Sequence, residues 1–583
     1  MANTSEERLD GNVLRDALAA CRRHFAYVVL FSLALNVLYL APSLFMLQVY
    51  DRVLTSGDVL TLVYLLLVLV ISLGTLAFLD ATRMRLLAAM AKRFDRLVAP
   101  HVLNAALRRE GSAAAGQVQL VRELDTLRAA VSGPPALAAI DAPWTPVYIG
   151  VCFIIHPWLG VLTLGGGVLL LLIAYINQRA SARALKANLQ ASSAMYALQQ
   201  ADAAQMETAR AMGMRKALVS RQLRAREQMS QSMRDQARSG AAYASSTKFF
   251  RLLLQSSALG LGVLLALEQQ ISAGAIIAAS ILATRAFSPI ELIVGAWPQF
   301  EQGRQAYAVL KAVLQTEHGA RIHTSLPAPK GALSVEGVSV RAPGSDRALL
   351  FNAAFRAAPG EIIGVVGPSG AGKSTLLRAI AGAIAPDQGV VRLDGAKLSD
   401  WDPDQLGRYV GYLPQDIGLL PGAVADNIAR FSRNGDDRSD ADIVAAAQAV
   451  GAHEMILSLS KGYDTVVGAG GRGLSVGQAQ RVALARAFYR NPMLLALDEP
   501  NAHLDVDGER ALVSALDAAR QRGATALVVA HSATLVAVVD KLLVVRDGRI
   551  EAFGPRDQIA ARLSGAQPRP AVVASSGETV GRS

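Results

Sequence analysis

The chain has 583 residues, of which 52% are hydrophobic and only 18% are charged. This balance excludes an ordinary soluble enzyme and indicates membrane-spanning segments, and the length allows two to four domains. The net charge of +11 could suggest a nucleic-acid partner, but most of the surplus in the N-terminal half lies in two loops beside apolar segments, so we interpret it as a signal of membrane topology and expect no nucleic acid.

Six apolar runs occupy the N-terminal half, and a membrane-spanning helix needs about 20 such residues. The runs cover residues 25–50, 59–79, 143–155, 159–176, 252–267 and 271–297. The third and fifth are short, so their ends are defined only to within several residues. The two cysteines, Cys21 and Cys152, lie in or next to apolar segments, which argues against a disulfide framework or a thiolate metal site. We predict a short segment over 1–24 and a six-helix transmembrane domain over 25–317.

The connections between these runs differ in charge. Residues 82–135 and 178–248 are rich in Arg and Lys, whereas the other connections are short and carry almost no basic residue except Arg52. By the positive-inside rule, both long loops and both termini are cytoplasmic. Apolar residues recur at helical spacing within both loops, so we expect the membrane helices to continue into the cytoplasm. The alternative is a pair of disordered basic loops.

Two charges, Arg285 and Glu291, interrupt the sixth run, with Pro289 between them. Charges inside a membrane are costly and usually face a cavity or a partner. The alternative is that this helix ends near Ala283 and that both charges lie at the membrane interface. The sequence leaves both interpretations open.

The pattern changes after a predicted linker over 318–332, which contains Pro327, Pro329 and Gly331. Strands and helices then alternate, which is typical of an α/β domain, and we assign it to 333–565. The final segment, 566–583, is rich in Pro, Ser and Gly and is expected to be disordered.

The strongest motif of the α/β domain is a glycine-rich phosphate-binding loop between an apolar strand, 362–366, and a helical run, 376–381. Its residues are Gly367, Pro368, Ser369, Gly370, Ala371, Gly372, Lys373, Ser374 and Thr375. The glycines let backbone N–H groups curl around the phosphates of ATP, Lys373 reaches the β- and γ-phosphates, and Ser374 ligates Mg²⁺.

An acidic pair, Asp498 and Glu499, follows the apolar run 494–497. A buried strand there would deliver Asp498 to the metal and place Glu499 beside the γ-phosphate, where it is the natural general base for an attacking water. Such a pair could instead cap a helix, but the phosphate-binding loop upstream favours the catalytic interpretation.

Four further motifs, in order, carry a resemblance to ABC transporters. The run 474–481, Leu-Ser-Val-Gly-Gln-Ala-Gln-Arg, resembles their signature, and residues 501–505 occupy the position of their D-loop. Gln415 resembles their Q-loop glutamine, which senses Mg²⁺ and the attacking water, and His531 resembles their switch histidine. The resemblance implies paired ATP sites, each combining the phosphate-binding loop, Gln415, Asp498, Glu499 and His531 of one chain with signature residues of the other. Those signature residues are Ser475, Gly477 and Gln478.

The resemblance is made more specific by three sequence segments of the membrane half, 44–54, 141–146 and 280–289. They are similar to the type I secretion system permease/ATPase family, within it to the branch of protease and lipase exporters, over about 20–565. The resemblance implies a homodimer in the bacterial inner membrane that docks a periplasmic adaptor and an outer-membrane channel and exports unfolded polypeptide. Only about 24 residues precede the first predicted helix, which leaves no room for a peptidase domain, so the expected cargo signal is C-terminal and uncleaved.

Two departures from the family pattern keep alternatives open. Val476 stands where the signature usually has glycine, and a β-branched residue restricts the backbone beside the bound phosphate. No aromatic residue for stacking adenine occurs near 340–342, which implies weaker base recognition. The alternatives are a lipid or drug exporter of the same architecture, or a weakly hydrolysing half that pairs with a different, active half.

Overall fold

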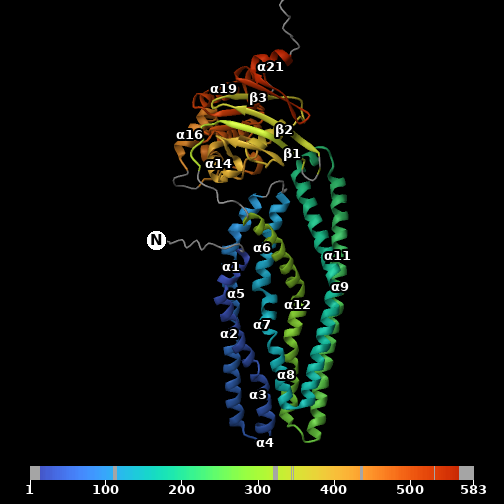
Figure 1. Ribbon diagram of the computed structural model, residues 1–583. Helices are drawn as coiled ribbons and strands as arrows, with labels where there is room; N and C mark the ends of the chain where they lie inside the picture. Colours follow the sequence, from blue (N-terminus) through green and yellow to red (C-terminus); the bar gives the residue numbers. More distant parts are fainter. Residues whose placement is uncertain are drawn as a thin grey trace, which may run out of the picture. The chain divides into compact units, whose positions relative to one another are not determined.

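The computed structural model describes residues 13–108, 114–318, 326–342, 345, 347–432, 438–530 and 532–563. The chain divides into two compact units, 1–320 and 321–583. Every described element of the first unit is a helix, and the second unit combines strands with helices (Figure 1). His531 and the predicted C-terminal tail lie outside the described residues, as do residues 319–325 of the predicted linker.

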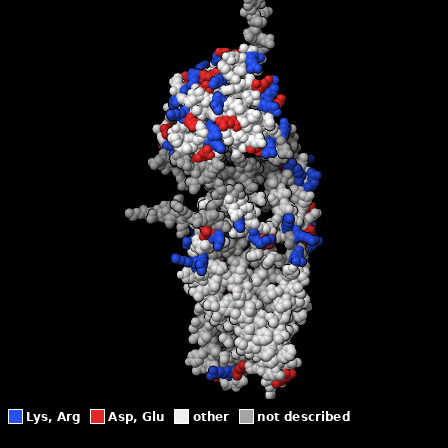
Figure 2. All heavy atoms as spheres, viewed as in Figure 1, with Lys and Arg blue, Asp and Glu red and all other residues white. Residues whose placement is uncertain are grey.

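Six helical segments in the described part of the first unit are long and apolar enough to cross a membrane. They are Arg22–Ser56, Val59–Leu107, Gln119–Ile155, Pro157–Ile176, Ser245–Leu267 and Ala273–Gln315. On the face shown in Figure 2, a broad band without charged side chains separates two charged regions of this unit. Such a band is what a hydrocarbon layer about 30 Å thick requires. The prediction of six transmembrane helices is confirmed.

The helices of the first unit differ in length, and the longest extend far beyond the length needed for a membrane. In chain order they are α1 Val13–Ala20, α2 Arg22–Leu38, α3 Ala41–Gln48, the π-helix Val49–Val53, α4 Leu54–Ser56, α5 Val59–Arg108, α6 Ala114–Ser132, α7 Pro134–Asp141, α8 Trp144–Ile155, α9 Pro157–Ala204, α10 Met206–Ala211, α11 Arg215–Leu267 and α12 Ala273–His318. The longest, α11, has 53 residues, and at 1.5 Å per residue it spans about 80 Å. α9 and α11 lie side by side. The alternative of disordered basic loops is therefore wrong for the described residues.

The two charges of the sixth run lie within a single continuous helix, α12, which also contains Pro289. The guanidinium of Arg285 stacks over the Tyr39 ring, 4.2 Å from its centroid. The carboxylate of Glu291 forms an ion pair with Arg251 of α11, with 3.0 Å between Glu291 Oε1 and Arg251 Nε. The interpretation that the helix ends near Ala283 is wrong, because both charges lie inside α12 and face partners from other segments, Tyr39 between α2 and α3 and Arg251 of α11.

A buried polar network joins the first three membrane segments. Arg83 of α5 donates to Ser32 of α2 at 3.0 Å and pairs with Asp141 of α7 at 3.2 Å. Asp80 accepts from Arg83 as a third partner at 2.8 Å, and Asn36 donates to Asp141 at 3.3 Å. Because the Arg83 side chain is only 8% exposed, these partners stabilise a charge that would otherwise be buried at high cost.

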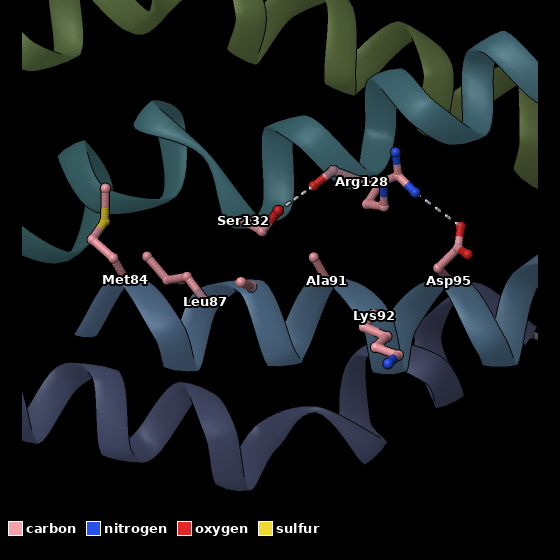
Figure 3. Close-up of a pocket in the computed structure, with 8 residues that line it drawn as sticks. Met84, Leu87, Ala91, Lys92, Asp95, Arg128 and Ser132 are labelled. Carbon is pink, nitrogen blue, oxygen red and sulfur yellow. Dashed lines mark hydrogen bonds and ion pairs between the residues drawn. The ribbon is translucent and has the colours of Figure 1, made fainter. Parts of the chain in front are cut away.

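A pocket of about 490 Å³ lies between α5 and α6. Met84 and Leu87 of α5 contribute apolar atoms to its wall, and Asp95 and Arg128 line its other end (Figure 3). Arg128 contacts Asp95 across the two helices at 3.5 Å. Both charged side chains of this pair are more than one third exposed, so the contact contributes little to stability.

The second unit is an α/β domain built on two main sheets. Its strands are β1 Leu333–Arg341, β2 Ala348–Ala357, β3 Ile362–Val366, β4 Gln388–Leu393, β5 Ala396–Lys397, β6 Val410–Leu413, β7 Gly422–Ala423, β8 Val466–Val467, β9 Leu494–Leu497, β10 Thr525–Val529, β11 Lys541–Arg546 and β12 Arg549–Pro555. Its helices are α13 Lys373–Ile380, α14 Pro403–Tyr409, α15 Val424–Ile428, α16 Asp440–Ala449, α17 His453–Leu457, α18 Val476–Phe488, α19 Val506–Gln521, α20 Ala533–Val538 and α21 Arg556–Leu563. The larger sheet has the order β12-β11-β3-β10-β9-β6, and the smaller has the order β2-β1-β4-β5.

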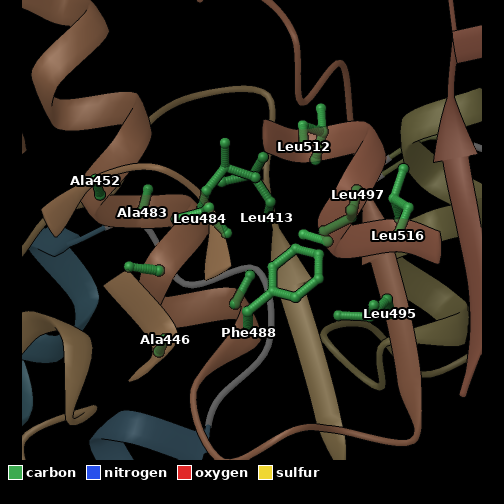
Figure 4. Packing of buried hydrophobic residues seen from close by; sticks show 14 of the residues in the cluster. Leu413, Ala446, Ala452, Ala483, Leu484, Phe488, Leu495, Leu497, Leu512 and Leu516 are labelled. Carbon is green, nitrogen blue, oxygen red and sulfur yellow. The ribbon is translucent and has the colours of Figure 1, made fainter. Parts of the chain in front are cut away.

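Strands β9 and β10 are buried along their whole length. This is typical of parallel strands that helices cover on both faces, and it explains why their sequences are continuous apolar runs. On one face, Ala483, Leu484 and Phe488 of α18 meet leucines of the sheet (Figure 4). The prediction of an α/β ATPase fold beside a six-helix membrane domain is confirmed.

We predict that Asp141→Asn destabilises the membrane half. The variant keeps the shape of the side chain but removes one of the two carboxylates that face buried Arg83, which should cost about 3 kcal/mol of unfolding free energy. Thermal unfolding of the purified protein in detergent measures the change. The matched control is Asp125→Asn, since Asp125 pairs with Arg128 at a site where its own side chain is 57% exposed. Equal midpoints for the two variants would contradict the prediction.

Candidate nucleotide-binding site

Four neighbouring parallel strands of the larger sheet bring the predicted motifs to one edge. Gly364 of β3, Val528 of β10, Leu497 of β9 and Leu413 of β6 lie in one row across the sheet. Because the strands are parallel and in register, the segments that follow them start at the same edge, where ligands of open α/β sheets bind. The phosphate-binding loop follows β3, the acidic pair follows β9, and Gln415 follows β6. The predicted position 531, after β10, lies outside the described residues.

Glycine is required at two positions of the phosphate-binding loop. Gly367 has φ 153° and Gly372 has φ 101°. A Cβ atom at Gly367 would lie 2.0 Å from the Val545 carbonyl oxygen, and one at Gly372 would lie 2.6 Å from the Leu349 carbonyl oxygen. Gly370 instead faces open space, with no atom within 4 Å of an added Cβ. The loop therefore lies close to β11 of the larger sheet at one end and to β2 of the smaller sheet at the other, and it is open in its middle.

The loop curls around the side chain of Lys373. This side chain is buried, and its Nζ donates to the carbonyl oxygens of Gly367 at 2.9 Å and Pro368 at 3.0 Å. Lys373 is also the first residue of α13, so a cation and a helix N-terminus coincide, as anion binding requires. Of the remaining predicted loop residues, Pro368, Ser369 and Gly370 are exposed, Ser374 and Thr375 are partly buried in the first turn of α13, and Ala371 is buried.

The acidic pair differs in its surroundings. Asp498 is 3% exposed, and its backbone N–H donates to the Leu413 carbonyl oxygen of β6 at 3.0 Å. Glu499 is half-buried and has φ 49°. A left-handed backbone is rare for a long side chain and costs of order 1–3 kcal/mol, and it persists where the surrounding structure imposes it. The two acids therefore differ in burial and in backbone conformation, at the edge where the phosphate-binding loop begins.

The oxygen atoms at this edge suit a magnesium ion. Asp498 supplies a buried carboxylate, Ser374 a hydroxyl, and Gln415 an exposed side-chain amide two residues beyond β6. Magnesium prefers such oxygen ligands together with phosphate and water. A carboxylate buried beside the phosphate-binding loop also favours a cation as its partner. The donor set therefore fits the metal.

The signature run forms the start of α18. Ser475 is the N-cap, and its hydroxyl accepts from Gln478 N at 3.3 Å while the Gln478 side chain accepts from Ser475 N at 2.9 Å. A Cβ atom at Gly477 would lie 2.8 Å from the His503 carbonyl oxygen. The side chain of Val476 is 56% exposed. The bonds described for Ser475 and Gln478 join them to each other and not to the phosphate-binding loop.

Two residues of the same run have contacts that the sequence analysis missed. Gln480 is buried, and its amide donates to the Pro500 carbonyl oxygen at 3.2 Å, next to Glu499. Arg481 pairs with Asp505 at 2.5 Å, and Asp505 also accepts from Gly508 N as the N-cap of α19. These two donors lower the pKa of Asp505. Both residues belong to the signature run, so the sequence marked them as part of a motif. Only the structure shows that they bond α18 to the segment after β9.

Comparisons with known proteins agree with this geometry. Residues 25–290 match the family model of the ABC transporter transmembrane region, and residues 350–502 match the family model described as ABC transporter. The type I secretion system ATP-binding protein PrsD of Rhizobium meliloti (strain 1021) is 39% identical over 553 residues, which cover 94% of this chain and 94% of that protein. The chain belongs to the type I secretion branch of the ABC transporters.

Further relatives of this ABC exporter are also named for secretion. The cyclolysin secretion/processing ATP-binding protein CyaB of Bordetella pertussis is 29% identical, over 95% of this chain and 78% of CyaB. The leukotoxin translocation ATP-binding protein LktB of Mannheimia haemolytica is 28% identical, over 94% and 78%. A solved bacterial Atm1-family ABC exporter with ATP bound has a TM-score of 0.81 at 21% identity, over 94% of this chain and 97% of that one, and shares the fold. The protein is a multi-pass membrane ATPase that couples ATP hydrolysis to transport.

We predict that Glu499→Gln binds ATP but hydrolyses it at least about 100-fold more slowly, because the amide cannot accept a proton from water. Steady-state phosphate release and ATP binding by the purified protein test the two effects separately. Glu551→Gln, on the outermost strand β12, is the control, since the Glu551 side chain pairs with Arg546 and follows none of the strands that carry the predicted motifs. Turnover near that of the wild type would remove Glu499 from the role of general base.

Proposed function

We propose that this ABC exporter is the energy-coupling component of a type I protein secretion system in the bacterial inner membrane. The observation that carries the proposal is the 39% identity to PrsD over nearly the full length of both proteins, together with the site at the edge of the larger sheet. Its cargo is an unfolded polypeptide with a C-terminal signal that is not cleaved. The comparisons do not favour the lipid or drug exporter or the weakly hydrolysing half.

The working unit is a homodimer with two ATP sites, and it docks a periplasmic adaptor and an outer-membrane channel. In each chain, Ser475 and Gln478 bond to each other at the exposed start of α18. A helix N-terminus with free N–H groups binds anions. We assign Ser475, Gly477 and Gln478 to the γ-phosphate of ATP held by the phosphate-binding loop of the partner subunit. Each site therefore needs both chains.

The residues divide the work of hydrolysis as follows. Lys373 exchanges its two carbonyl acceptors for the β- and γ-phosphates, and the backbone of 367–375 binds the phosphate oxygens. Glu499 accepts the proton of the attacking water, while Gln415 and His531 orient that water and the γ-phosphate. Asp498, Ser374 and Gln415 would hold Mg²⁺, which when bound neutralises the negative charge that develops between the β- and γ-phosphates.

Secretion from whole cells tests the proposed function. We expect cells that produce the wild-type exporter to release a cargo protein, and cells that produce Glu499→Gln to retain it, while Glu551→Gln behaves as wild type. Mass spectrometry of the released protein should find both of its ends intact relative to its gene. Loss of an N-terminal leader that depends on this exporter, or unchanged release by Glu499→Gln, would contradict the proposal.

We predict that residues 82–135 and 178–248 face the cytoplasm, since they hold most of the basic residues beside the spans. In a background without Cys21 and Cys152, a cysteine at Ser230 should resist a membrane-impermeant thiol reagent in intact cells. A cysteine at Gln269, in the connection between α11 and α12, is the control and should react. Rapid labelling at position 230 would reverse the orientation.

We predict that Val476→Gly raises the ATPase rate about 10-fold, the lower end of what one hydrogen bond to a charged group supplies. Glycine allows closer approach of the backbone to phosphate, and the Val476 side chain, 56% exposed, has few contacts within the chain to lose. ATP affinity should change little, because first capture depends on residues 367–375. An unchanged or lower rate in the same lipid would mean that valine is neutral or compensated.

A further inference from the structure

The second half of the predicted linker is hydrogen-bonded to the ATPase domain. Residues 326–332 directly precede β1, and they contact the domain at two points, Leu326 and residues 330–332. Pro327 and Pro329 lie between these two points. Because proline fixes its own φ and stiffens an extended chain, the two contacts are joined by a short, rigid segment.

The first contact is a pair of hydrogen bonds between Leu326 and Gln405 of α14. The side-chain amide of Gln405 donates to the Leu326 carbonyl oxygen at 2.7 Å, and its oxygen accepts from Leu326 N at 3.4 Å. The Leu326 side chain also packs against the apolar cluster that contains Trp401 and Leu406. Gln405 thus satisfies both backbone groups of a residue that lies outside any sheet, and it holds that residue on the domain.

The second contact is made by the carboxylate of Asp394, in the turn between β4 and β5. It accepts hydrogen bonds from three consecutive backbone N–H groups, those of Lys330, of Gly331 at 3.2 Å and of Ala332 at 2.9 Å. Asp394 N also donates to the Ala332 carbonyl oxygen at 2.8 Å. Hydrogen bonds to a charged acceptor are about twice as strong as those between neutral groups, so one side chain holds three residues of the segment.

The same segment fits closely against the amino ends of β9 and β10. Gly331 is buried and has φ 103°, and an added Cβ atom would lie 2.8 Å from the Gly523 carbonyl oxygen and 3.3 Å from that of Met493. The hydroxyl of Thr525, the fully buried first residue of β10, donates to the Gly331 carbonyl oxygen at 2.6 Å. The opposite ends of these two parallel strands lie at the edge that carries Asp498.

We propose that Asp394 and Gln405 are positioning residues that make residues 326–332 a rigid strap, through which a movement of the ATPase domain reaches α12 along the chain itself. A flexible linker would absorb such a movement within its own length. With the strap in place, residues 319–325 alone separate the anchored segment from α12, which ends at His318. The proposal needs only that ATP hydrolysis drives transport, and it is independent of the cargo.

Two substitutions remove the anchors and leave the phosphate-binding loop as it is. Asp394→Asn leaves one acceptor oxygen for three N–H groups, and Gln405→Leu keeps much of the bulk of the side chain without a donor or an acceptor. In the full-length double variant, hydrogen exchange at 330–332 should be at least about 10-fold faster, the lower bound for losing a hydrogen bond to a charged group. Gln405→Leu alone, with exchange measured at Leu326, serves as the test variant if the double variant does not fold.

Transmission is measured at α12 by thiol labelling. Ser288 of α12 and Pro134 of α7 line a common pocket of about 330 Å³, so a movement of α12 relative to α7 changes access to it. In purified Ser288→Cys protein without Cys21 and Cys152, the labelling rate should change when the Mg²⁺ complex of a non-hydrolysable ATP analogue is added. With the double substitution this change should be lost, while ATP hydrolysis stays close to that of the wild type.

Asp540→Asn is the matched control. The Asp540 carboxylate accepts from Ile362 N at 2.9 Å, and Asp540 N donates to the Ile362 carbonyl oxygen at 2.8 Å. It makes the same kind of backbone contact at the amino end of β3, and its described contacts include no bond to the strap. Its loss should lower the thermal midpoint as much as Asp394→Asn does, yet leave the exchange at 330–332 and the response of α12 intact.

Four results would overturn the proposal. Unchanged exchange at 330–332 in the double variant would mean that the two side chains do not fix the strap. A normal response of α12 in that variant would mean that the movement reaches the membrane half by another route, and no response in the wild type would mean that none is transmitted. Loss of the response in Asp540→Asn as well would reduce the effect to a loss of stability. None of these measurements uses a cargo, so they judge the strap separately from the secretion assay, which tests the proposed function.

Discussion

The register of four parallel strands is the constraint on which the ATPase half depends. β3, β10, β9 and β6 differ widely in sequence position, yet residues of all four lie in one row. Parallel strands must end together if they start in register, so a single arrangement of backbone hydrogen bonds brings three described functional segments to one edge. The strands are apolar throughout because helices cover both faces, and this burial allows Asp498 to reach the site without exposure of the strand that carries it.

Hydrogen bonds between backbone and side chain then set how freely each segment moves. The phosphate-binding loop meets neighbouring carbonyl oxygens at Gly367 and Gly372, and the Gln415 loop is hydrogen-bonded on both sides, at Leu413 and Gly418. In the membrane half, contacts between charged or aromatic side chains have the corresponding role. There, Arg83, Arg251 and Arg285 each face a carboxylate or an aromatic ring from another segment of the membrane half. A polar group in an apolar layer must have a partner, and each such pair fixes two helices relative to each other.

The fold could be predicted well from the sequence because the apolar residues of both halves follow clear patterns. Long apolar runs predict membrane helices, and apolar strands before glycine and acidic motifs predict an α/β nucleotide domain. It left the sixth helix undecided, since the partners of Arg285 and Glu291 are Tyr39 and Arg251, which are remote along the chain. Contacts such as that of Gln480 with Pro500 could not be predicted either, because they depend on how α18 packs against the segment after β9 and not on the local sequence pattern.

The bonds of Lys373 to its own loop bear on how the enzyme can turn over repeatedly. The ammonium group has two carbonyl acceptors within the loop, so its charge is hydrogen-bonded by the protein itself. In the role proposed for Lys373, ATP competes with these acceptors, which makes the affinity for ATP weaker than the bare attraction between lysine and phosphate would give. The same competition would make the release of ADP easier. In this role, the hydrogen bonds of Lys373 to its own loop would lower the affinity for ATP and, for the same reason, make it easier for ADP to leave at the end of each cycle.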